Sequence, residues 1–140
     1  MLEAFSTPHN RTLTSFFLAG SCAFGIAAAA VGISDNPPGI LLAFLAIGAF
    51  FLAFVHPWRT ARQYRLLLFA SMLGFVLFAI LHNVFDALAT LSANVRGLHG
   101  LLIALDVGAF LIAILACPPA FFVGAIGSIA MFIRNRRRPT

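Results

Sequence analysis

Residues 98–138 read LHGLLIALDVGAFLIAILACPPAFFVGAIGSIAMFIRNRRR. The stretch is apolar as far as residue 133, holds Pro118-Pro119 near its middle and ends in a cluster of arginines. One helix over 98–133 would be ~54 Å long, against ~30 Å for the hydrocarbon core of a bilayer. A break at the two prolines would instead give two spans. The two alternatives place the arginine cluster on opposite sides of the membrane.

Three further apolar stretches precede this one, at about 12–33, 38–56 and 66–91. The 140 residues are 61% hydrophobic and only 9% charged. A soluble domain of this size could not hide so much apolar surface, because small folds leave a large share of their surface in water. The sequence predicts an all-α fold: an integral membrane four-helix bundle that forms a single transmembrane domain over 1–140.

The arginines decide between one and two spans at the C-terminus. The chain has no lysine, and eight of its nine arginines fall in alternate gaps between the apolar stretches: Arg11, Arg59, Arg62, Arg65, Arg134, Arg136, Arg137 and Arg138. Cationic segments stay in the cytoplasm, so both termini are expected there, with the protein in a cell inner membrane. The fourth helix is then one long helix, kinked at the prolines, whose first turns project beyond the far membrane face with the end of the third.

The same arginines bear on partners. Arginines at the membrane surface attract anionic lipid headgroups, so the bilayer is the expected partner. A short basic tail without a reading module does not indicate nucleic acid. Arg11, the apolar run and Ala28-Ala29-Ala30 also resemble a cleavable signal peptide, although the run from 12 to 33 is long enough to span.

The first apolar stretch is rich in small residues. Ala23 with Ala27, and Ala28 with Gly32, form pairs of small residues four apart. Such faces let helix backbones approach closely in lipid. We expect this face to pack inside the bundle, with a homodimer contact as the alternative.

The gap between the second and third stretches carries aromatic anchors. The only tryptophan, Trp58, and the only tyrosine, Tyr64, flank the arginines Arg59, Arg62 and Arg65. Aromatic rings of this kind favour the membrane–water interface. We expect this segment, which starts as a loop after Pro57, to lie at the level of the headgroups.

Ionisable residues inside the third and fourth stretches need an explanation, since an aspartate at mid-membrane costs at least ~2.5–3.5 kcal/mol. His82 and Asp86 lie one turn apart, and His99 and Asp106 share one face of the fourth stretch. A turn centred near Asn94 would bring His82 and Asp106 to the same depth. We therefore expect an intramembrane polar cluster on the non-cytoplasmic side, with His82 and Asp106 as its buried pair. Its members are His82, Asp86, Arg96, His99 and Asp106.

Three roles remain open for this cluster. Interhelical hydrogen bonds could fix the register of the third and fourth helices. Asp106 and His82 could move protons or ions, although the cytoplasmic half of the apolar stretches holds no acid and, apart from His56 at the very end of the second stretch, no base. His82 and His99 could ligate a haem, although Phe75, Phe78 and Phe85 crowd the third helix.

No sequence motif indicates catalysis. The chain has no phosphate loop, no HExxH pair and no convincingly spaced Ser, His and Asp triad. We expect a non-enzymatic accessory, scaffold or assembly component, without cofactor, that packs with itself or with a larger membrane complex. A small transporter or proton-coupled channel is the alternative, and a haem-binding redox subunit is a further one.

Overall fold

The computed structural model describes residues 2–34 and 36–136, and for residues 2, 3 and 96 the backbone alone. A short 3-10 helix, η1 (Leu2–Phe5), precedes α1 (Pro8–Val31) and α2 (Pro37–Val55). The remaining elements are α3 (Ala61–Leu91), α4 (Arg96–Leu111), a π-helical turn η2 (Ile112–Ala116) and α5 (Cys117–Arg136). Four helical stretches are long and apolar enough to cross a membrane, the last being the continuous helix Gly97–Arg136. The predicted all-helical, four-span architecture is confirmed.

Two helices begin earlier than predicted, because polar residues cap them. Thr7 accepts a hydrogen bond from the backbone N–H of Asn10 at 3.2 Å, and Pro8 occupies the first turn of α1. Thr60 and Gln63 form a capping box at the start of α3. Caps of this kind satisfy N–H groups that the helix itself leaves unpaired. Residues 8–11, which precede the predicted span, are therefore helical, and Arg62 and Arg65 lie in α3 and not in a loop.

The proline pair leaves the fourth helix continuous. Upstream of Pro118, the Cys117 N–H donates to the Ile112 carbonyl five residues earlier, which is the π-helical pattern of η2. A proline lacks an N–H and its ring collides with the carbonyl four residues before it, so a wider turn there relieves both problems. The predicted single helix is confirmed, and the prolines are accommodated as a π-turn one turn upstream.

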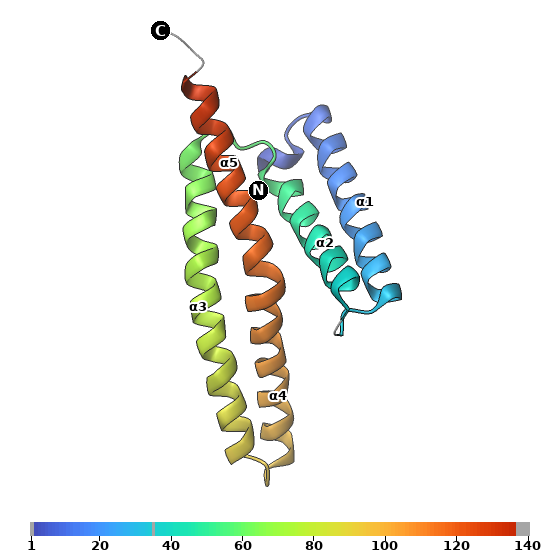
Figure 1. Cartoon of the computed structure of the whole chain (residues 1–140), viewed down its shortest axis with the longest axis vertical. Helices are drawn as coiled ribbons and strands as arrows, with labels where there is room; N and C mark the ends of the chain where they lie inside the picture. Colours follow the sequence, from blue (N-terminus) through green and yellow to red (C-terminus); the bar gives the residue numbers. More distant parts are fainter. Residues whose placement is uncertain (1, 35, 137–140) are drawn as a thin grey trace.

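The spans pack as two antiparallel hairpins joined along one seam. Helix α1 packs on α2, α3 packs on α4 and α5, and α2 joins the two hairpins through η2 and α5. Within the described residues, the backbone of α1 approaches neither α3 nor α5 closely. The bundle is therefore open along one side, with the spatial order α1, α2, α5, α3 (Figure 1).

Small residues make up the core, and large apolar side chains face outward. Most buried apolar residues are alanines, among them Ala43, Ala53 and Ala120. By contrast, Phe16 and Leu73 are about 70% exposed. This distribution suits a lipid surround, in which helices associate through close packing of small residues rather than by hiding large ones from water.

The α3–α4 hairpin extends past the α1–α2 turn at its lower end in Figure 1. Helix α3 has 31 residues and α2 has 19, so α3 is ~46 Å long and α2 ~28 Å. The α3–α4 hairpin therefore projects past the α1–α2 hairpin (Figure 1), whereas its projection beyond the membrane face stays a prediction. Arg11, Arg59, Arg62, Arg65, Arg134 and Arg136 all belong to the opposite end of the molecule, which we call the arginine end. Arg137 and Arg138 lie outside the described residues.

Candidate functional site

The turn between α3 and α4 sets the register of the polar residues. Ser92 N–H donates to the Leu88 carbonyl at 3.0 Å, and Val95 N–H donates to the Ser92 carbonyl at 2.9 Å. Beyond the turn, Nδ1 of His99 lies 2.9 Å from the carbonyl oxygen of Ala89 on α3. This tight connection leaves little freedom for the two helices to slide, so residues equidistant from the turn are brought to the same level.

The predicted contact between His82 and Asp106 is present. His82 Nδ1 lies 2.6 Å from Asp106 Oδ1, and the ring of Phe110 packs against the imidazole at 5.2 Å. Neither of these two atoms has a hydrogen-bond partner among the described residues, so their short approach is a polar contact without hydrogen-bond geometry. The histidine side chain is 35% exposed and the aspartate 17%. The pair is therefore half-buried at the edge of the α3–α4 interface, and each polar atom depends on the other.

The other members of the expected cluster do not join this pair. Asp86 is exposed, although one turn from His82, and it forms no ion pair with the described side chains. His99 is engaged by the Ala89 carbonyl instead. Residue 82 is partly buried and residue 86 is exposed, so the contact of α3 with α4 includes the first position and not the second. The expected counter-charge on Arg96 lies outside the described side chains.

The face of the fourth helix that carries His99 and Asp106 continues through Cys117, Gly124 and Ser128, and it packs against α3. Cys117 and Gly124 are buried and Ser128 is partly buried. A Cβ on Gly124 would lie 2.7 Å from the backbone nitrogen of Leu68. Glycine thus permits the close approach of α5 to α3.

The two histidines are poorly placed to share one haem. His99 contacts Ala89, seven residues beyond His82 on α3, so the two imidazoles are offset by ~10 Å along the helices. Each is also already engaged by its own partner on the facing helix. Among the described residues there is also no group of three or more His, Cys, Asp or Glu that could hold a metal ion.

The small residues of α1 divide into two kinds. Ala28 is buried, and Gly32 ends α1 with a φ of 85°, a value that favours glycine. A Cβ on Gly39 of α2 would overlap the Gly32 carbonyl, so the two backbones meet at the turn. Ala27 is partly buried, whereas Ala23 is exposed. The expectation of packing inside the bundle therefore fits Ala28 and Gly32 but not Ala23.

The aromatic anchors at the arginine end are part of the packing. The rings of Trp58 and Tyr64 meet edge to face at 5.4 Å, and Tyr64 OH donates to the Val55 carbonyl at 3.1 Å. A Cβ on Gly127 of α5 would overlap the Tyr64 ring. Tyr64 therefore ties the α2–α3 connection to α5. Arg59, Arg62 and Arg65 are exposed at the same end.

A polar contact that the sequence did not predict joins the N-terminal segment to both helices of the first hairpin. Thr14 is fully buried, and its hydroxyl lies 3.0 Å from the Ala4 carbonyl and 3.1 Å from the Ala53 carbonyl. Arg11 Nε donates to the Phe5 carbonyl at 2.8 Å. Nothing in the sequence distinguishes Thr14 from its neighbours Thr12 and Ser15, and its partner Ala4 precedes the first predicted span.

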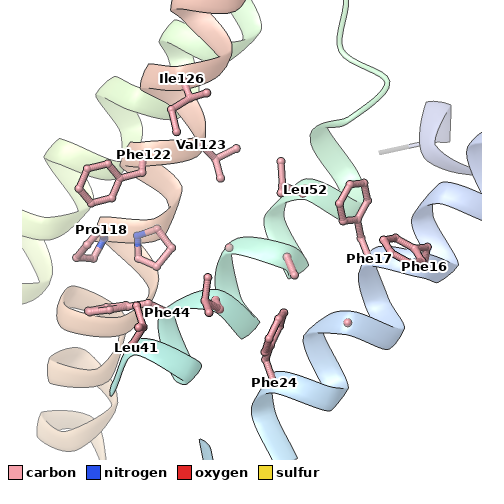
Figure 2. Close-up of a pocket in the computed structure, with 15 residues that line it drawn as sticks. Phe16, Phe17, Phe24, Leu41, Phe44, Leu52, Pro118, Phe122, Val123 and Ile126 are labelled. Atoms are coloured by element: carbon pink, nitrogen blue, oxygen red, sulfur yellow. The ribbon is translucent and has the colours of Figure 1, made fainter. Parts of the chain in front are cut away.

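An open apolar groove is separate from the polar pair. An apolar groove of about 690 Å³ lies between the α1–α2 hairpin and α5, and none of its lining residues is ionisable (Figure 2). His82 and Asp106 are not among them.

Comparisons with protein-family models, with curated proteins and with solved structures give no match.

Proposed function

We propose that this chain is a non-enzymatic multi-pass membrane protein of the accessory, scaffold or assembly class. In this proposal it resides in a cell inner membrane with both termini in the cytoplasm, as the arginine distribution favours. The gathering of the described arginines, Arg96 apart, at one end of the molecule supports this orientation. The core of small residues and the outward-facing large ones support residence in lipid.

One observation carries the non-catalytic, non-transporting role: His82 and Asp106 contact each other and line no part of the large groove. A transport route needs ionisable groups along a path that water or ions can reach. Here the pair is closed on itself, and Phe110 packs against it. The arrangement favours a clasp that holds α3 to α4.

Proton flux into proteoliposomes separates the clasp from the transporter alternative. A pH-sensitive dye trapped inside vesicles reports any flux driven by a pH gradient. We expect no flux that depends on Asp106, and we expect Asp106→Asn to lower the thermal stability. Asp86→Asn is the matched control, since Asp86 is exposed on the neighbouring turn. Flux that Asp106→Asn abolishes at unchanged stability would establish transport instead.

An absorption spectrum addresses the haem alternative. The offset of ~10 Å between the two histidine contacts disfavours a shared axial ligation. We expect the protein purified from haem-supplemented cells to lack a Soret band. A Soret band that disappears in both His82→Ala and His99→Ala would overturn the proposal in favour of a redox subunit.

Disulfide cross-linking in membranes tests self-association. In a Cys22→Ser background, Ala23→Cys places a thiol on the exposed face of α1, and Ala28→Cys places one in the contact with α2. If the small-residue face meets a second copy, only the first variant forms a covalent dimer. Equal yields from the two variants would mean random collision, and would count against a defined dimer.

A C-terminal fusion to green fluorescent protein tests the orientation, because green fluorescent protein does not become fluorescent when it is exported unfolded to an oxidising compartment. Bright cells are the expected result. Dark cells, together with a C-terminal alkaline phosphatase fusion that is active, would contradict the cytoplasmic C-terminus.

A further inference from the structure

The open side of the bundle contains a groove that no segment among the described residues fills. Its walls are α1, α2 and α5, and Figure 2 shows Phe17, Phe24, Phe44 and Phe122 around it. Its floor includes Gly48, where a Cβ would meet no atom within 4 Å. Empty space with apolar walls at the depth of the lipid tails will be filled by whatever apolar molecule fits.

The size of the groove selects the occupant. A spanning helix ~10 Å across and ~30 Å long occupies on the order of 2,000 Å³. The groove holds about 690 Å³, within the ~300–1,000 Å³ typical of small-molecule sites. Along α2 it runs from Leu41 to Leu52, which is ~17 Å and close to half the hydrocarbon core. These dimensions suit one acyl chain from one leaflet and are too small for a partner helix.

The charge at the near end of the groove selects the headgroup. Arg11 precedes the lining residue Phe16 by five positions, and Arg134 follows Ile126 by eight, so they lie ~8 and ~12 Å further along the helices. Both are exposed, and the Nε bond to the Phe5 carbonyl holds the Arg11 side chain at this end. The only acidic residue in the sequence near this end is Glu3. A phosphate at headgroup depth would therefore meet predominantly positive charge.

We infer that the groove binds one anionic phospholipid, with an acyl chain between α1 and α5 and the phosphate near Arg11 and Arg134. The lipid would close the open side of the bundle, where α1 and α5 do not touch through their backbones. This inference requires membrane insertion but does not depend on the scaffold role.

Native mass spectrometry and thermal unfolding of the full chain in detergent test the site, with dioleoyl phosphatidylglycerol and dioleoyl phosphatidylcholine as the two probes. We expect phosphatidylglycerol to remain bound at one copy per chain and to raise the melting temperature more than phosphatidylcholine does. Gly48→Leu should abolish both effects by filling the groove. Gly108→Leu on α4 is the matched control, because a Cβ there also meets no atom within 4 Å and the position is outside the groove.

Gly20→Leu provides a second filling variant if Gly48→Leu does not fold, since Gly20 also lines the groove and has open space at its Cβ. Arg11→Gln and Arg134→Gln should each lower the affinity for phosphatidylglycerol about five-fold, the equivalent of ~1 kcal/mol per arginine at a membrane surface. The affinity for phosphatidylcholine should not change. Arg62→Gln on α3, an exposed arginine away from the groove walls, is the control.

Three results would overturn the inference. The first is full retention of phosphatidylglycerol by both filling variants. The second is equal binding of the two lipids with no effect of Arg11→Gln or Arg134→Gln. The third is a change from dimer to monomer in Gly48→Leu at unchanged lipid binding, because this would identify a second copy of the chain as the occupant.

Discussion

Each of the two hairpins combines one close backbone approach with one polar contact, but the two kinds of contact lie at opposite ends in the two hairpins. In the α1–α2 hairpin the backbones meet at the turn, Gly39 against Gly32, and the polar contact of Thr14 lies at the arginine end. In the α3–α5 hairpin the close approach lies toward the arginine end, at Gly124. Its polar pair, His82 with Asp106, lies toward the turn.

Each hairpin thus has one end held by steric fit and the other held by a contact between polar groups. Close packing without Cβ atoms brings helices together, but it does not by itself fix how far they slide. A polar contact in an apolar surround does fix this, because breaking it leaves a group without a partner. The comparison predicts that, in both hairpins, substituting the closely packed glycine lowers the free energy of unfolding more than substituting a residue of the polar contact.

The largest effect is expected from Gly39→Ala. Its Cβ would overlap the Gly32 carbonyl, which is backbone and cannot rotate away. Overpacking typically costs ~1–3 kcal/mol, and we expect a loss at or above the upper end of that range. Thermal unfolding in detergent, followed by helical circular dichroism, measures it. Gly48→Ala is the control, and equal stability of the two variants would show that the turn is not tightly packed.

Gly124→Ala should have the second-largest effect. The added Cβ would lie 2.7 Å from the Leu68 nitrogen, so α3 and α5 must separate by a few tenths of an ångström. We expect a loss of ~2 kcal/mol in the free energy of unfolding. Gly108→Ala, with no atom near its Cβ, should be neutral or slightly stabilising. A larger loss from Gly124→Ala than from Gly39→Ala would reverse the ranking of the two hairpins.

Thr14→Val should cost ~1–2 kcal/mol, because the isosteric side chain leaves two carbonyls without their hydroxyl partner. Thr12→Val is matched to it, since the Thr12 hydroxyl is exposed and bonds only within α1, to the Pro8 carbonyl at 3.1 Å. Protease accessibility of the N-terminal segment should rise in Thr14→Val alone. Equal effects of the two variants would show that the contact of η1 with the hairpin contributes nothing.

A double-mutant cycle at His82 and Asp106 should give the smallest effect. Each single leucine substitution leaves the partner atom unpaired, and the double substitution removes both polar groups. Interhelical hydrogen bonds in membrane proteins contribute ~0.6 kcal/mol on average and at most ~1.7 kcal/mol, so we expect a coupling energy near 1 kcal/mol. Additive effects of the two single variants would show that the pair does not hold the helices together.

The sequence was most informative where chemistry and distance along the chain act together. Apolar length predicted the four spans, and arginines at alternate gaps predicted the continuous fourth helix despite Pro118-Pro119. The short turn made the His82–Asp106 contact predictable, since antiparallel helices pair residues equidistant from their connection. The same reasoning did not place Asp86 correctly, because a step of four residues along the helix also rotates the side chain, and Asp86 is exposed.

What the sequence alone determined is therefore the four apolar helices of spanning length and the pairing of His82 with Asp106, all of which follow from local composition and spacing. Only the tertiary structure decided that Thr14 joins Ala4 to Ala53, that the prolines are relieved in η2 and that α1 stands apart from α5. These features depend on contacts between segments distant along the chain. In lipid, exposing a large apolar side chain on the surface of the bundle carries no hydrophobic cost, so hydrophobicity does not predict which helices pack together. Small residues, which let backbones approach closely, and a few polar contacts determine which helices pack together.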